Sequence, residues 1–485
     1  MNHRNNPVRA RVRSTQLRLA IAAAIVGVAA ALPAHAELEM TPRLGLTAVW
    51  MDNVELAQSP TPKQEEYIGQ ITPGLHLEQS NQRFNTYLDY EAQALFYKND
   101  SDRDEVFHHG DLGLSVEAVA DWFFVDVGGR YAQSIVDPAQ PANRNNLFGV
   151  GNLVDTASAT ITPALRHTFG KVDLLADYTR GFVDYRDTLD DGAAVAAQAQ
   201  DSDNEEANFS LGSSDGNATV TWLARYRWER AEFDEVLPFE YERADGEIGV
   251  RITNSLRLIG RGGVESDPTL LVATGGLDES FWDAGFSWSR DEGNELRLLV
   301  GERFFGTSYE ALLRLSGRFL SAEFGYNEDP TTQSQRFALR ELPTAMDPPP
   351  VSDPAFGRVD AETFLSKRLY GQLGLKGRLT EIRLLVTAEE REYLRLAGIE
   401  DRFRSAELSA SRRFGARTTG EIGASIMKAD LREGGSFDED LYRISVSREL
   451  GQRTSLVLAG YHLERSGDLQ DYDSNWVSLG LQMTF

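Results

Sequence analysis

Residues 218–228 read ATVTWLARYRW, and every second side chain in this stretch is apolar. The apolar set is Ala218, Val220, Trp222, Ala224, Tyr226 and Trp228, and polar residues such as Thr221, Arg225 and Arg227 stand between its members. Successive side chains of a β-strand point to opposite faces, so this alternation predicts a strand with one apolar face and one polar face.

The same alternation recurs along the whole chain. It is clear in residues 84–96, 244–252, 282–288, 382–389 and 475–485. A soluble sandwich alternates too, so the pattern alone does not say which face meets water. We count about 22 such segments, and roughly 18 at the fewest, and a barrel of that size encloses a lumen too wide for side chains to fill. The apolar face is therefore expected to point outward into lipid.

The connections between these segments alternate in length. Short ones are expected near residues 80–82, 120–121, 215–217, 253–255, 377–379 and 451–453, and longer ones near 51–64, 134–153, 184–205, 327–358, 399–401 and 429–439. Outer-membrane barrels join their strands in this way, with short periplasmic turns and long extracellular loops. The sequence thus predicts an all-β fold, a single transmembrane up-and-down antiparallel β-barrel in a bacterial outer membrane.

Two of the expected external connections stand out. The hairpin at Gly306 would be unusually tight for the outer side. Residues 327–358 contain six prolines and are long enough to fold into the lumen as a constriction. Long loops are usually functional or disordered, and we expect this one to stay at the cell surface.

Both ends of the chain carry targeting features. Residues 1–36 comprise an arginine-rich start, an apolar run from Leu19 to Leu32 and the triplet Ala34-His35-Ala36, which together predict a secretory signal peptide. Residues 37–485 are then the barrel domain. The alternating segment 475–485 ends on Phe485, and it resembles the terminal strand signature that barrel-assembly machinery reads. Outer-membrane lipid and lipopolysaccharide are the other expected partners.

Composition excludes several classes of function. The chain has 49 Lys and Arg against 74 Asp and Glu, a formal net charge of -25, which disfavours nucleic acid as a partner. It contains no cysteine, so it has no disulfides and no thiolate metal site.

The polar faces of the expected strands carry charges of both signs, and these residues are the candidates for the lumen. The acidic candidates are Asp89, Glu91, Asp126, Asp177, Glu247, Asp283, Glu323 and Glu389, and the basic ones are Arg130, Arg225, Arg227, Arg251 and Arg383. Charged side chains that line a pore set its selectivity. Ion pairs that cross-link neighbouring strands explain the same pattern equally well.

Catalysis and metal binding find little support in the sequence. Five histidines follow residue 36, namely His76, His108, His109, His167 and His462, but no Gly-x-Ser-x-Gly element accompanies them. The acidic run 100–105 lacks the turn glycine and the final glutamate of a calcium loop. We expect no enzyme activity, no cofactor and no metal site.

A family resemblance rests on three stretches. Residues 50–56 contain Asp52-Asn53-Val54, residues 71–75 read ITPGL, and a strand follows at 85–97. Here the chain resembles the β-barrel porin 2 group and, more narrowly, the outer-membrane barrels associated with PEP-CTERM and exosortase systems. Pro73, and Pro163 in a similar stretch, are expected at bulges or strand ends because proline cannot donate to a ladder.

The resemblance implies a channel or scaffold associated with exopolysaccharide or surface-protein export, whose partners would be exopolysaccharide or secretion components. Two alternatives stay open: a general diffusion porin for small solutes, and a barrel-embedded enzyme that modifies lipid or lipopolysaccharide.

Overall fold

The computed structural model describes residues 38–58, 60–141, 144–187, 200–216, 218–233, 236–267, 277–291, 293–338, 361–396, 398–432, 435–468 and 470–485. The predicted signal peptide, residues 1–36, lies outside the described residues. Among the described residues, no helix is long and apolar enough to cross a membrane.

The described residues form 22 antiparallel strands in one sheet, and β1 pairs with both β2 and β22, which closes the sheet into a barrel. The strands are β1 (Glu39–Met51), β2 (Glu66–Ser80), β3 (Phe84–Tyr97), β4 (Glu105–Val119), β5 (Phe123–Ile135), β6 (Leu153–Phe169), β7 (Val172–Asp187), β8 (Ser202–Ser213), β9 (Val220–Phe233), β10 (Phe239–Arg251), β11 (Leu256–Asp267), β12 (Leu277–Asp291), β13 (Asn294–Arg303), β14 (Gly306–Ser316), β15 (Leu320–Thr332), β16 (Thr363–Lys376), β17 (Thr380–Tyr393), β18 (Glu400–Arg413), β19 (Thr418–Asp430), β20 (Ser436–Glu449), β21 (Thr454–Gly467) and β22 (Tyr472–Thr484). The predicted all-β, up-and-down antiparallel barrel is confirmed.

The pairing register assigns the two faces of the wall. Residues directly opposite each other in an antiparallel pair share a face, and Trp222 on β9 lies opposite Ile248 on β10. Their exposed fractions are 41% and 57%, and comparable exposed apolar residues occur on strands all round the barrel. The apolar face therefore points outward.

The connections follow the predicted alternation, although the strands extend further than expected and shorten the loops. The turns that follow the even-numbered strands are short and lie at one rim of the barrel, together with the backbone hydrogen bond from the Phe485 N–H to the Pro42 carbonyl oxygen. At the other rim, β13 and β14 are joined by two residues only, and Gly306 has φ +109, a conformation that favours glycine. The tight external hairpin is thus present.

The two prolines lie inside continuous strands, so the expectation of bulges or strand ends is wrong. Ile71 lies opposite Ala94 and Gly74 opposite Glu91, which is the same register on both sides of Pro73. Pro163 interrupts the ladder between β6 and β7 in the same way. Each proline interrupts the pairing with one neighbouring strand for two residues, with β3 at Pro73 and with β7 at Pro163. Pairing with the other neighbour, β1 or β5, continues.

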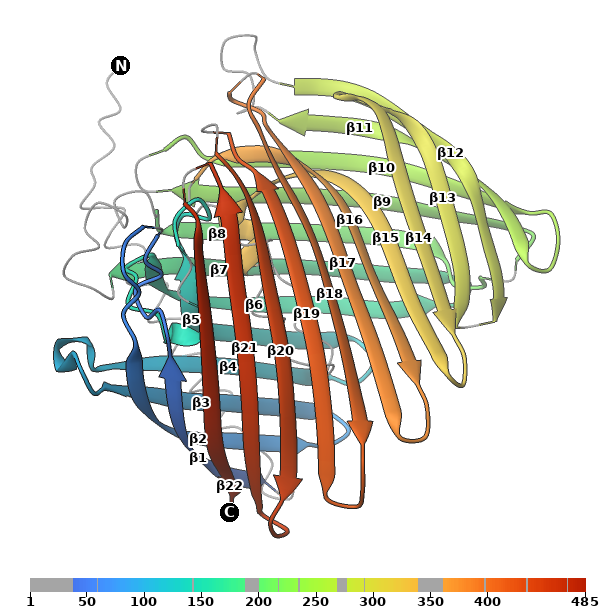
Figure 1. The fold of residues 1–485 in the computed structure, drawn as a ribbon. Helices are drawn as coiled ribbons and strands as arrows, with labels where there is room; N and C mark the ends of the chain where they lie inside the picture. Colours follow the sequence, from blue (N-terminus) through green and yellow to red (C-terminus); the bar gives the residue numbers. More distant parts are fainter. Residues whose placement is uncertain are drawn as a thin grey trace.

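Figure 1 shows the arrangement of the wall. Strands β16–β22 form the near wall and cross the far wall of β3–β11, because the strands of a barrel are tilted against its axis. Strands β12–β14 connect the two walls at a corner of the barrel.

Side chains and loop segments occupy part of the lumen at its extracellular end. Lumen-facing Met51, Tyr97 and Trp476 form an apolar cluster with Leu147 and Phe148 of the β5–β6 connection. A short helix, α3 (Gln333–Ala338), follows β15 and packs against β6, β7 and β8. This part of segment 327–358 lies inside the barrel, so the expectation of a surface loop is wrong for it; residues 339–358 lie outside the described residues.

Candidate functional site

The predicted lumen residues all stand at inward positions of the register. They lie on β3 (Asp89, Glu91), β5 (Asp126, Arg130), β7 (Asp177), β9 (Arg225, Arg227), β10 (Glu247, Arg251), β12 (Asp283), β15 (Glu323) and β17 (Arg383, Glu389). The structure does not gather them into one place, because they are spread around the whole circumference.

The inner face of β2–β8 is predominantly acidic among the described residues. Asp89 accepts hydrogen bonds from Arg43 at 2.6 Å and contacts His76 at 2.9 Å. Asp177 accepts from Asn208 at 3.0 Å, and Asp126 lies 3.9 Å from Arg166. Glu91 stands opposite His109, and Arg130 stands opposite Asp111.

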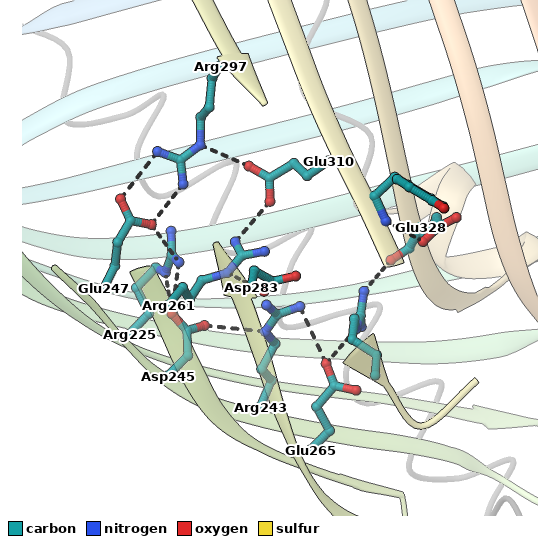
Figure 2. A network of polar contacts seen from close by, with 12 residues as sticks. Arg225, Arg243, Asp245, Glu247, Arg261, Glu265, Asp283, Arg297, Glu310 and Glu328 are labelled. Atoms are coloured by element: carbon teal, nitrogen blue, oxygen red, sulfur yellow. Dashed lines mark hydrogen bonds and ion pairs between the residues drawn. The ribbon is translucent and has the colours of Figure 1, made fainter. Parts of the chain in front are cut away.

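The inner face of β9–β15 carries a continuous chain of arginines and carboxylates, part of which Figure 2 shows. In order of contact its members are Asp283, Arg261, Glu310, Arg297, Glu247, Arg225, Asp245, Arg243, Glu265, Arg303 and Asp329. We call this set the arginine chain. It contains Arg225, Glu247 and Asp283 of the predicted residues.

Short hydrogen bonds hold the members of the arginine chain together. Arg225 donates from Nε and Nη2 to Asp245 at 2.9 and 2.8 Å. Arg297 donates from both Nη atoms to Glu247, at 3.2 and 2.7 Å, and from Nε to Glu310 at 3.0 Å. Such two-pronged guanidinium–carboxylate pairs hold both partners in a defined orientation.

The corner of the wall brings the members of the arginine chain together. Glu247 is on β10 and Arg297 is on β13, three strands away, and they meet across the concave inner surface. Inward glycines make this bend possible. A Cβ at Gly263 would lie 2.2 Å from a carbonyl oxygen of β10, and one at Gly301 would lie 1.9 Å from a carbonyl oxygen of β12.

A cavity of about 370 Å³ opens beside the arginine chain. Arg225, Arg227, Arg243, Arg261 and Arg303 line it, together with Asp245, Glu310 and Asp329 and with amide and hydroxyl side chains. The Arg225 and Arg227 side chains are 32% and 42% exposed and are the most exposed of these arginines, since Arg243, Arg261 and Arg303 are 12% exposed or less.

Sequence reasoning missed most of the arginine chain, namely Arg243, Asp245, Arg261, Glu265, Arg297, Arg303, Glu310 and Asp329 as site residues. The alternation through 256–267 carries Arg261 and Glu265 at inward positions. Gly260 and Gly262 occupy the outward positions on either side of Arg261, and without large apolar side chains there the pattern is weak. Extending the two-residue period through these glycines would have found both residues.

The remaining predicted residues form separate pairs. Glu323 contacts Arg314 at 3.2 Å, and Arg383 contacts Glu381 of the same strand at 2.7 Å. Arg227 pairs with Glu229 and Glu206, while the backbone N–H of Arg251 donates to Thr219. The Glu323–Arg314 and Arg227–Glu206 pairs link neighbouring strands of the wall, whereas Arg383–Glu381 and Arg227–Glu229 lie within one strand.

The helix α3 bridges two sides of the lumen. Gln335 donates to Glu229 on β9 at 3.1 Å, and Ser334 donates to Asn204 on β8 at 3.1 Å. Arg336 donates to Glu389 on β17 at 2.5 Å. Glu389 is therefore a docking point for an inward segment, and the Gln333 and Ser334 side chains are almost fully buried.

The connection between β5 and β6 is held in the lumen by β21, which lies on the other side of the β1–β22 pairing that closes the barrel. Arg465 on β21 donates to the carbonyl oxygens of Pro138, Ala139 and Gln140 at 2.8, 3.0 and 3.1 Å. Further along, Asn145 and Asn146 have positive φ, which asparagine tolerates. This turn directs Leu147 and Phe148 into the apolar cluster.

The Asp52-Asn53-Val54 motif follows β1 and contacts β22, so it supports the β1–β22 pairing that closes the barrel. Asp52 accepts hydrogen bonds from the backbone and side chain of Asn475 at 2.7 and 2.8 Å, and Asn53 donates to the Asp473 carbonyl at 2.8 Å. Burial alone would raise the pKa of the Asp52 carboxyl, but the bonds from Asn475 and the charge of Lys63 hold that pKa below its ordinary value. Val54 packs in the apolar cluster.

The histidines are dispersed. His108 lies on the outward face beside Tyr90, His167 stacks on Trp122, and His109 faces the lumen. Among the described residues, one group of three carboxylates has metal-binding spacing, namely Glu390, Glu392 and Glu400 on the outward face. Lys367 forms ion pairs with Glu390 and Glu392, and Arg402 forms ion pairs with Glu390 and Glu400.

A closed 22-stranded barrel with an apolar outer face and a charged lumen defines an outer-membrane β-barrel protein. The protein resides in the bacterial outer membrane.

No protein-family model and no curated protein matches the sequence. Similar solved structures include the FrpB iron transporter from Neisseria meningitidis, at 9% identity and TM-score 0.49, over 92% of this chain and 82% of that one. The siderophore receptor PirA from Pseudomonas aeruginosa is 10% identical, with TM-score 0.45 over 92% and 80%. OpdK from Pseudomonas aeruginosa is 10% identical, with TM-score 0.35 over 92% and 99%. At these values the likeness says nothing about ligand or mechanism.

Proposed function

We propose that the protein is a channel for small hydrophilic solutes, with an extracellular mouth narrowed by its own loops. The observation that carries this proposal is the accessibility of charged side chains on the inner wall. Asp89, Arg225 and Arg227 are each about one third or more exposed and point into the barrel. Accessible charges in that position require water in the lumen.

The inward segments support a narrowed mouth. Residues 136–141, residues 144–152 and helix α3 dock on lumen-facing side chains near the extracellular ends of the strands. A wide barrel with such segments passes small solutes more readily than large ones. We propose a non-enzymatic role, with lipid and lipopolysaccharide against the outer face and barrel-assembly machinery acting on the strand that ends at Phe485.

Conductance in planar bilayers tests the channel. The full chain, purified as a heat-modifiable barrel, is expected to produce discrete current steps in KCl. Because acidic side chains predominate on β2–β8, the reversal potential in a KCl gradient is expected to show a preference for K⁺ over Cl⁻. Asp89→Asn combined with Glu91→Gln should reduce that preference. A folded barrel that gives no current would contradict the proposal and favour a closed scaffold.

A second candidate is the role in exopolysaccharide or surface-protein export. Its support is the resemblance at Asp52-Asn53-Val54 and at residues 71–75. Deleting the gene should then lower the amount of exopolysaccharide or sorted protein at the cell surface, and complementation should restore it. Unchanged surface polymer and protein in the deletion strain would leave the diffusion channel as the better proposal.

A further inference from the structure

We propose that the cavity beside the arginine chain binds a small sugar acid, a solute with one carboxylate and several hydroxyl groups. This inference rests on the proposed channel function, because the solute must enter the lumen to reach the cavity. The cavity, at about 370 Å³, has room for a solute of this size.

Two accessible guanidinium groups provide the carboxylate contact. Arg225 and Arg227 are two residues apart on β9 and point to the same side of the wall. Arg225 engages its acidic partners through Nε and Nη2, and Arg227 engages its own through Nε. Nη1 of Arg225 and both Nη atoms of Arg227 donate no hydrogen bond to a described residue. These free N–H groups are suited to a planar carboxylate.

The attraction for an anion is local to the unpaired N–H groups of Arg225 and Arg227. Five guanidinium groups line the cavity against three carboxylates, those of Asp245, Glu310 and Asp329. The same arginines also pair with carboxylates outside the lining, namely Glu206, Glu229, Glu247, Glu265 and Asp283. A fourth acidic residue of the lining, Glu328, turns its carboxylate away to the Tyr309 N–H and the Tyr326 hydroxyl. Across the lumen the inner face of β2–β8 is acidic, so an anionic solute is repelled from that side.

The other polar groups suit hydroxyls. Glu310 and Asp329 are about one third exposed and can accept hydrogen bonds from sugar hydroxyl groups. Ser308 and Asn327 also line the cavity and can donate or accept. A simple carboxylate such as acetate would use the arginines alone, whereas a sugar acid would use both sets of groups.

Isothermal titration calorimetry on the purified full chain tests the site, with galacturonate, galactose and acetate as probes. Galacturonate is expected to bind more tightly than either of the others. The double variant Arg225→Gln with Arg227→Gln should weaken galacturonate binding about tenfold or more, because charged hydrogen bonds to the ligand are lost. Arg443→Gln removes the same kind of charge from β20, halfway round the barrel, and should leave the affinity unchanged.

A second double variant distinguishes loss of the binding site from misfolding of the barrel. Arg225→Lys with Arg227→Lys keeps both charges and their acidic partners, and should still weaken binding severalfold because lysine lacks the planar fork. Equal galacturonate affinity in the wild type and the variants would overturn the site, and so would equal affinity for galactose and galacturonate. Equal binding of acetate would overturn the sugar-acid assignment. Current steps without galacturonate binding refute this site alone, whereas binding without current refutes the channel.

Discussion

Arg465 holds the first part of the β5–β6 connection, residues 138–140, against the inner wall. Its guanidinium donates three hydrogen bonds to the carbonyl oxygens of residues 138–140, at 2.8, 3.0 and 3.1 Å, and lies over the Phe437 ring at 3.6 Å. We predict that Arg465→Gln releases residues 138–140 from the inner wall and raises single-channel conductance, while residues 145–147 keep their hydrogen bonds from Gln93 and Tyr97.

The magnitude follows from the number of bonds. A hydrogen bond from a charged donor contributes about 1.5 kcal/mol at the low end of its range. Glutamine can retain one of the three bonds, so the docked state loses about 3 kcal/mol, which shifts the ratio of docked to released loops about 150-fold. A shift of that size favours release of residues 138–140 and should widen the mouth.

Planar-bilayer recording of the two proteins in KCl measures the effect, and limited proteolysis of residues 136–152 measures the release directly. The matched control is Glu439→Gln, because Glu439 lies 3.7 Å from Arg465 and its loss leaves the three loop bonds in place. That control should conduct like the wild type. Unchanged conductance and unchanged proteolysis in Arg465→Gln would show that the three bonds do not hold the loop.

Three further predictions concern the barrel and its assembly. Trp222→Arg, in the middle of the apolar stretch 218–228, should lower the free energy of unfolding by about 2 to 4 kcal/mol, while the inward Leu223→Arg should be far milder; equal losses in denaturant titration would mean that the faces are reversed. Gly301→Ala places a Cβ 1.9 Å from a carbonyl oxygen and should destabilise the barrel by about 1 to 3 kcal/mol, whereas Gly260→Ala meets nothing within 4 Å and should be neutral. Phe485→Ala should reduce the yield of heat-modifiable barrel in cells, and an undiminished yield would argue against its role as the assembly signal.

The strands, their two faces and the class of barrel could be predicted from the sequence. The reason is that the two-residue period is a local property: each strand shows its inward and outward positions without reference to any other strand. The same locality explains why Asp89, Arg225 and Glu389 could be placed toward the lumen. The wide lumen followed from the number of strands alone.

Which inward groups meet was decided only by the tertiary structure. Glu247 and Arg297 touch because the wall bends sharply at β10–β14, and the inward glycines that permit this bend show no periodic signal. Arg465 reaches Pro138 across more than 300 residues, and α3 joins β8 and β9 to β17. Such contacts depend on closure and curvature of the whole barrel. A single strand therefore specifies that a charge faces the lumen, whereas only the closed sheet specifies its partner.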